Sequence, residues 1–376
     1  MKISSQFDGG KIEVISCERA DDIQLAIPKD NQSDFYQWFY FRLSGAAEQT
    51  CQIKLTDLAK SAYPPGWQGY QAVASYDREY WFRVDSEFDG DTLTIKHTPS
   101  LNSVYYAYFA PYSTERCADF IASLQHSPLV STEVLGQTLD GQDMDLLTIG
   151  EPGEGKLTCW VIGRQHPGET MASWWMEGFL ERLLDESDPV ARTVLDKAVF
   201  YVVPNMNPDG SRRGHLRTNA CGANLNREWQ TPTLERSPEV YYVRAKMQQT
   251  GVDFCLDVHG DEALPYNFIA GAEGNPSWTP RQAGLQKSYM DALVVASPDF
   301  QTEHGYEIDA PGTADLRICT NYMAETFDCL AMTLEMPFKD TIDTPDHDEG
   351  WSPDRCRRLG EANLSAILKV LPELVR

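Results

Sequence analysis

Along the first 115 residues, apolar and polar positions alternate in short runs, a pattern that predicts β-strands rather than helices. Aromatic and apolar runs of strand length occupy residues 38–43, 80–84, 92–96 and 104–109. Turn signals separate them, notably Pro64-Pro65-Gly66 and Asp89-Gly90-Asp91. We therefore predict a small antiparallel β-sandwich domain for residues 1–115.

The pattern changes near residue 115, where apolar strands begin to alternate with amphipathic helices. Continuous apolar runs occupy residues 157–162, 198–203, 252–258 and 330–334. Helices are predicted for residues 171–184 and 353–370, with Leu371-Pro372 ending the last one. Apolar strands separated by helices indicate an α/β domain over residues 116–376, with a mixed, mostly parallel sheet flanked by helices.

Composition narrows the function classes. Acidic residues outnumber basic ones by 56 to 32, which gives a net charge of −24 and argues against nucleic acid or an anionic membrane as a partner. No run of about 20 apolar residues is present, and the first residues lack the apolar core of a signal peptide. We expect a cytoplasmic protein with no membrane span, and nothing in the sequence assigns an oligomeric state.

The strand at residues 157–162 leads into a candidate metal-binding pair, His166 and Glu169. In sheets of this kind, ligands bind beyond the carboxyl ends of the strands. A histidine and a glutamate on such a loop can bind one zinc ion. The spacing is not unique, because His304 and Glu307 repeat it, but no comparable strand precedes His304.

A third candidate ligand, His259, follows the strand at residues 252–258. Three protein ligands leave a coordination position open, which is typical of a catalytic zinc site. His259 and Glu262 repeat the same spacing and could supply two ligands themselves, but His166 and Glu169 would then have no role. We interpret Glu262 as polar lining near the site.

The strand at residues 330–334 is followed by Glu335, a carboxylate that is costly to bury unless it has a partner or a task. A general base in a zinc hydrolase is such a task. A buried salt-bridge partner is the alternative. The long loop after residue 203 adds arginines at intervals, and arginine suits the recognition of carboxylates.

Taken in order, these motifs resemble the zinc carboxypeptidases of the carboxypeptidase A superfamily, and most closely their cytosolic carboxypeptidase branch. An upstream segment at residues 105–113 also resembles the end of the N-terminal β-sandwich of that branch. The resemblance rests on ordered motifs: His166-Pro167-Gly168-Glu169, Pro204-Asn205-Met206-Asn207-Pro208-Asp209-Gly210, Arg217 with Asn226-Arg227, Asp257-Val258-His259-Gly260 and Thr333-Leu334-Glu335.

The resemblance implies a role for each matched residue. One zinc ion would be held by His166, Glu169 and His259. Glu335 would activate the zinc water and carry its proton to the leaving amine. Arg217 would polarise the scissile carbonyl and stabilise the oxyanion. The terminal carboxylate of the substrate would be bound by Asn226 and Arg227.

Two further positions follow from the family pattern. The family often uses a tyrosine from the loop before the catalytic glutamate, and Tyr306 and Tyr322 both lie in that region. The cytosolic branch often has a basic residue that receives an acidic C-terminal side chain, and Arg317 is the candidate for it.

We therefore predict a zinc metallocarboxypeptidase that removes the C-terminal residue of peptides or proteins, with acidic C-termini as a possible preference. A related zinc amidohydrolase acting on N-acyl amino acids is the first alternative. A non-catalytic binding module with a vestigial site is the second, and the complete set of catalytic positions disfavours it.

Overall fold

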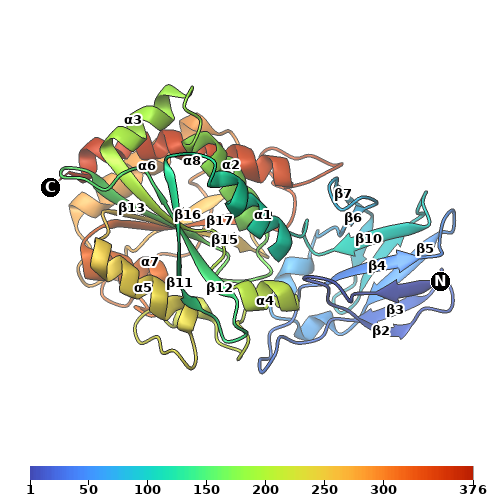
Figure 1. Ribbon diagram of the computed structural model, residues 1–376. Helices are drawn as coiled ribbons and strands as arrows, with labels where there is room; N and C mark the ends of the chain where they lie inside the picture. Colours follow the sequence, from blue (N-terminus) through green and yellow to red (C-terminus); the bar gives the residue numbers. More distant parts are fainter. Residues whose placement is uncertain (376) are drawn as a thin grey trace.

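The computed structural model describes residues 1–375, with the N-terminal strands and the large helix-covered sheet at opposite sides of Figure 1. The N-terminal part of the chain, up to Ala107 and called the N-terminal half below, contains two five-stranded sheets. The first has the order β1 (Lys2–Ser4), β4 (Tyr40–Ser44), β10 (Ser103–Ala107), β6 (Val73–Ser75) and β7 (Phe82–Arg83). The second has the order β2 (Glu13–Ser16), β3 (Ile23–Ala26), β5 (Cys51–Leu55), β9 (Leu93–His97) and β8 (Ser86–Phe88).

The two sheets bury one face each, as the alternating pattern predicts. In β5, for example, Cys51, Ile53 and Leu55 are buried and the residues between them are partly exposed. The neighbouring strands are antiparallel with one exception, the parallel pair β3 and β5. Two short 3-10 helices interrupt the strands, η1 (Leu58–Lys60) and η2 (Pro64–Trp67).

The third sheet is mixed, and its central strands are parallel. Its order is β11 (Val130–Gln137), β12 (Asp143–Ile149), β14 (Ala198–Val203), β13 (Leu157–Gly163), β15 (Phe254–Asp261), β17 (Leu330–Pro337) and β16 (Phe268–Ala270). The pairs formed by β14, β13, β15 and β17 are parallel, and the pairs at both edges are antiparallel. The carboxyl ends of four parallel strands therefore meet at one edge of the sheet.

Helices cover both faces of this sheet, as Figure 1 shows. One face carries α2 (Met171–Leu183), α3 (Pro189–Lys197), α6 (Pro280–Ala296) and α8 (Pro353–Leu374), and the other carries α5 (Pro238–Thr250) and α7 (Cys319–Phe327). Within β13, Cys159 and Val161 belong to the first core while Trp160 and Ile162 belong to the second. Burial on both faces explains why the strand is apolar at successive positions from Cys159 to Ile162. The α/β architecture predicted from the sequence is confirmed.

The prediction that Leu371-Pro372 ends the last helix is wrong, because α8 continues to Leu374 with Pro372 inside it. A proline in the last turn removes only one backbone donor, so the apolar face of α8 can continue into the core through Val370, Leu371 and Leu374. Among residues 1–375, no helix is both long and apolar enough to cross a membrane.

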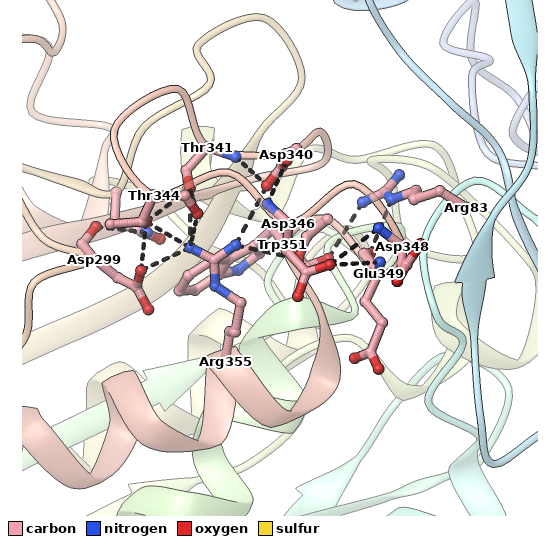
Figure 2. A network of polar contacts seen from close by, with 12 residues as sticks. Arg83, Asp299, Asp340, Thr341, Thr344, Asp346, Asp348, Glu349, Trp351 and Arg355 are labelled. Carbon is pink, nitrogen blue, oxygen red and sulfur yellow. Dashed lines mark hydrogen bonds and ion pairs between the residues drawn. The ribbon is translucent and has the colours of Figure 1, made fainter.

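The remaining helical segments lie near the junction of the two halves: α1 (Thr114–Leu124), α4 (Pro208–Arg213) and η3 (Leu225–Arg227). Buried contacts also join the halves directly. Arg83 of β7 donates to the carbonyl oxygen of Phe338, just after β17, at 2.9 Å and to that of Trp351, just before α8, at 3.2 Å. Figure 2 shows Arg83 beside the segment that leads from β17 to α8. The ring of Tyr108 stacks on Phe338 with a centroid distance of 4.6 Å.

Candidate active site

The turn after β13 presents His166 and Glu169 toward one point. Arg164 has a left-handed backbone with φ 64°, and its guanidinium donates to the carbonyl oxygen of Pro167 at 2.7 Å, which fixes the turn. Gly168 donates its N–H to the carbonyl oxygen of Leu216 at 2.8 Å. A Cβ at Gly168 would lie only 3.0 Å from that oxygen, so the close approach requires glycine.

The ligand atoms of His166, Glu169 and His259 lie within 4.8 Å of one another, and all three residues are buried. Nδ1 of His166 is 2.8 Å from Oε1 of Glu169, and Nδ1 of His259 is 2.8 Å from Oε2. The two Nδ1 atoms are 3.2 Å apart. Four potential ligand atoms from three residues therefore converge on one point.

Neighbouring side chains orient both imidazole rings. Nε2 of His166 is 3.0 Å from Oδ1 of Asn224, and Nε2 of His259 is 2.9 Å from Oδ2 of Asp257. Asp257 lies two residues before His259 on β15, so both side chains point to the same face of the sheet. With Nε2 carrying the proton in each ring, both Nδ1 atoms present a lone pair to Glu169.

This arrangement fits a zinc ion. Two Nδ1 lone pairs and a carboxylate face one another, and within residues 1–375 only the Gly260 N–H donates to the Glu169 carboxylate, at 3.1 Å from Oε2. A cluster of acceptors is stable only around a cation, and two nitrogens with one carboxylate form a catalytic zinc ligand set. Burial and the nearby Arg217 lower the pKa of His166 to about 4, which favours the neutral ring that a metal requires.

The pKa values of Glu169 and His259 are also shifted by the charged groups around them. Burial opposes ionisation of Glu169, but His166 and His259 outweigh it and lower its pKa. For His259, burial disfavours the cation, while Asp257 and Glu169 outweigh burial and raise its pKa. Both shifts indicate that a positive charge is favoured where the three side chains meet.

Glu335 lies beside this cluster, because it pairs with His259 in the register of the parallel strands β17 and β15. It is 7% exposed, and its carboxylate makes no hydrogen bond with any residue from 1 to 375; Oε2 is fully buried. Burial raises its pKa well above the usual value, with Glu169, Asp261 and Glu262 adding to the shift and His259 opposing it. A carboxylate with a raised pKa is suited to accept a proton near neutral pH.

Arg217 enters the same cavity from the loop between α4 and η3. Its guanidinium makes no hydrogen bond or ion pair within residues 1–375, and it lies between two aromatic rings. The guanidinium carbon is 5.6 Å from the ring centroid of Phe35 and 5.4 Å from that of Tyr63. Its hydrogen-bond donors are therefore free to bind a ligand.

Asn226 and Arg227 in η3 also face the cavity. Oδ1 of Asn226 accepts the N–H of Cys319 at 2.8 Å, which fixes the amide, and its Nδ2 group has no partner within the described chain. The Arg227 guanidinium uses one donor on the carbonyl oxygen of Asn226, at 2.7 Å. Both side chains therefore have unused donors suited to a carboxylate.

The structure brings most of the predicted residues together in a cavity of about 720 Å³. Tyr306 and Glu262 also line it, and the Tyr306 hydroxyl donates to Oδ2 of Asp261 at 2.7 Å. Tyr322 does not line it. Arg317 lies outside the cavity: its side chain is 58% exposed, and its guanidinium binds Asp315 at 2.8 Å.

Several residues of the site have no assigned role in the sequence prediction. Asp257 and Asn224 orient the two histidines, and Phe35 and Tyr63 come from the N-terminal half. For Asp257 a signal exists, because a carboxylate two residues before a ligand on the same strand shares its face. Nothing in the sequence pattern connects Tyr63 or Phe35 with Arg217.

Comparison with known proteins agrees with this geometry. A zinc carboxypeptidase family model matches residues 118–346, which is more than half of the chain, and a cytosolic carboxypeptidase N-terminal domain model matches residues 3–109. The chain therefore belongs to the zinc carboxypeptidase family. The match of both models places it with the cytosolic carboxypeptidases within that family.

Similar proteins with solved structures include the metallo-carboxypeptidase from Burkholderia cenocepacia, which is 50% identical, with a TM-score of 0.96 over 99% of each chain. A metallo-carboxypeptidase from Pseudomonas aeruginosa, solved in complex with (2-guanidinoethylmercapto)succinic acid, is 45% identical, with a TM-score of 0.97 over 100% of each chain. Cytosolic carboxypeptidase 1 from Xenopus laevis is 28% identical over 72% of this chain, which spans only 26% of that relative. The family and these structures identify a hydrolase of peptide bonds.

Proposed function

We propose that this protein is a carboxypeptidase that uses one zinc ion, held by His166, Glu169 and His259, to release the C-terminal residue of peptides. The observation that carries the proposal is the set of unpartnered donors on Asn226 and Arg227, which line the same cavity as His166 and Glu169, the two residues clustered with His259. A carboxylate bound by these donors restricts cleavage to the last peptide bond.

Each group in the cavity then has its own role in the reaction. Zinc, when bound, supplies a Lewis acid that polarises the substrate carbonyl and lowers the pKa of the attacking water. Glu335 takes the proton from that water and delivers it to the nitrogen of the leaving residue. The free guanidinium of Arg217 donates hydrogen bonds to the carbonyl oxygen as negative charge develops on it. Asn226 and Arg227 hold the terminal carboxylate so that the last peptide bond lies between these groups.

The C-terminal side chain would occupy the part of the cavity lined by Thr320 and Thr333, whose hydroxyls are 2.7 Å apart. The acidic residues Glu273, Glu303 and Asp309 line the same cavity. A preference for acidic C-termini, predicted through Arg317, would require that side chain to leave Asp315. The acidic lining instead supports neutral or basic C-terminal residues.

The test is a panel of peptides that differ only in the last residue, with products read by mass spectrometry and zinc measured in the purified protein. We expect about one zinc per chain and release of single C-terminal residues. Faster release of Glu or Asp supports the role of Arg317, and faster release of Lys or Arg supports the acidic lining. A parallel assay with N-acyl amino acids tests the amidohydrolase alternative. Absence of zinc, with no activity after zinc is added, contradicts the proposal.

We also propose that residues 1–115 and 116–376 are two structural domains that act together in the cytoplasm. The family-model boundaries at residues 109 and 118 support the division. The relationship to proteins named cytosolic carboxypeptidases supports the location.

A further inference from the structure

We infer that the N-terminal sandwich completes the active site, with Asp30 as a positioning residue for Arg217. The inference rests on the proposed function, in which Arg217 stabilises the developing oxyanion. It assigns a role in the reaction to a residue 187 positions away in the sequence.

The Asp30 carboxylate binds the backbone on both sides of Arg217. Oδ1 accepts the N–H of Leu216 at 2.8 Å, and Oδ2 accepts the N–H of Arg217 at 2.8 Å and that of Thr218 at 3.0 Å. Oδ2 also accepts the hydroxyl of Thr218 at 3.1 Å. The side chain is 4% exposed, and all its hydrogen bonds go to these three residues. Charge-assisted bonds to three successive N–H groups fix the direction in which the Arg217 side chain leaves the backbone.

Two rings of the same domain fix the other end of Arg217. Phe35 and Tyr63 lie within cation–π distance of its guanidinium, and no hydrogen bond or ion pair holds the guanidinium. Its position therefore depends on the backbone that Asp30 binds and on these rings. Tyr63 lines the active-site cavity directly. The N-terminal domain is thus part of the wall of the cavity.

Residues next to Asp30 also contact the rest of the loop that carries Arg217. The N–H of Asn31 donates to Nε2 of His215 at 3.2 Å, and Nδ2 of Asn31 donates to the carbonyl oxygen of Ala220 at 2.7 Å. A Cβ at Gly222, which has φ 81°, would lie 2.4 Å from the carbonyl oxygen of Gln32. The loop has no strand pairing or helix of its own between α4 and η3. Its shape depends on these contacts together with hydrogen bonds of its own, such as the Asn219 N–H to the carbonyl oxygen of Ala223 at 2.9 Å.

The test compares Asp30 with Asp8 in the full-length, zinc-loaded protein. Asp8 also joins the two halves through a carboxylate, accepting the N–H and the hydroxyl of Thr114 at 2.8 Å each, away from Arg217. We expect Asp30→Ala to lower kcat by about 10- to 100-fold, with KM and zinc content unchanged, because a small displacement of a catalytic group is costly. Asp30→Asn keeps the side-chain shape and should lose less, and Asp8→Ala should keep the parental kcat.

A double-mutant cycle separates positioning from a general effect on the fold. In an Arg217→Ala background, Asp30→Ala should cause no further loss of kcat, because the group that it positions is already absent. An equal loss in both backgrounds overturns the inference. If Asp30→Ala does not fold, the same cycle with Asp30→Asn decides.

The outcomes also separate this inference from the proposed function. Loss of kcat in Arg217→Ala with parental kcat in both Asp30 variants overturns the inference alone. Parental kcat in Arg217→Ala overturns the proposed role of Arg217 and the inference with it.

Discussion

Two regions of the molecule differ in whether their buried charged side chains have hydrogen-bond partners. Arg355 in α8 is 9% exposed, and its Nη2 lies within hydrogen-bond distance of Oδ1 of Asp299 (2.6 Å), of Oγ1 of Thr341 (2.9 Å) and of both oxygens of Thr344 (Figure 2). In the active-site cavity, by contrast, the guanidinium of Arg217 and the carboxylate of Glu335 have no hydrogen-bond partner among residues 1–375.

The difference indicates what each region is for. A buried charge held by several partners is stabilised by its own fold, and its contribution is structural. A buried charge without a partner costs folding free energy, and it is retained where something that binds later supplies the partner. The two regions are also joined in sequence, because the segment after β17, the strand that carries Glu335, leads into α8, which carries Arg355.

The largest expected effect is on the reaction rate when Glu335 is changed. We expect Glu335→Gln to lower kcat by about 10³-fold or more, because the amide cannot accept the proton from water. Thermal unfolding should shift little or to higher temperature, because an unpartnered carboxylate is replaced by a neutral group. Steady-state kinetics, zinc analysis and calorimetry on one preparation measure all three quantities. A kcat within tenfold of the parent contradicts the assignment.

For the partnered region, stability rather than rate should change. We expect Arg355→Met to lower the free energy of unfolding by about 3 kcal/mol, because it leaves the partly buried Asp299 carboxylate without its cation. The kcat of the folded protein should remain near the parental value. Lys369→Met in the same helix is the matched control: its ion pair with Glu373 is exposed, so its loss should cost less than about 1 kcal/mol.

The sequence alone was enough to predict some of these elements and not others. The central strands of the large sheet were predictable, because burial on both faces makes them mostly apolar. Strands β11 and β16 were not, since β11 is mostly exposed and β16 has only three residues. The proposed zinc ligands and Glu335 could be found because they lie at or just beyond the carboxyl ends of mostly apolar strands.

The partners of the site residues were harder to predict. Spacing places Arg217 in a loop, but it does not indicate that Asp30 and Tyr63 approach from another domain. Likewise, the position of Arg317 in the chain does not reveal that its guanidinium turns toward Asp315. Unpartnered charges are therefore recognised only when the whole fold is known, because a partner can come from any distance along the chain.

A smaller effect is expected on KM when a substrate-binding arginine is changed. The test compares Arg227, which has unused donors, with Arg317, which is paired with Asp315. We expect Arg227→Met to raise KM by about 10- to 100-fold, since a charged hydrogen bond to the terminal carboxylate contributes about 1.5–3 kcal/mol. Arg317→Met is the control, because its guanidinium is exposed and bound to Asp315, and KM should be unchanged for peptides with neutral ends. Equal effects of the two substitutions would remove Arg227 from carboxylate recognition.

The smallest effect is expected on the pH dependence of stability, through Glu239 in α5. This carboxylate has fewer partners than Arg355 but is not unpartnered like Glu335. It is buried outside the cavity, and its carboxylate has one side-chain partner, the amide of Asn219, at 3.3 Å. Burial raises the pKa of Glu239 to about 8, with Asp209 and Asp140 adding to the shift and Asn219 opposing it. The folded protein thus keeps this carboxyl protonated at pH values where the unfolded chain, with its pKa near the ordinary value of about 4.3, has lost the proton.

The sign of the pH dependence follows from that difference. Below about pH 4 both states are protonated and the stabilising contribution is complete, and it declines as pH rises through the folded pKa of about 8. Between pH 6 and 8 the parent should lose about 1 kcal/mol of unfolding free energy per pH unit through this group. Glu239→Gln, which cannot ionise, should lack that slope while both proteins remain equally active at pH 6. Parallel stability curves for parent and variant, measured by urea unfolding at each pH, would show that burial does not raise the pKa of Glu239 in the folded protein.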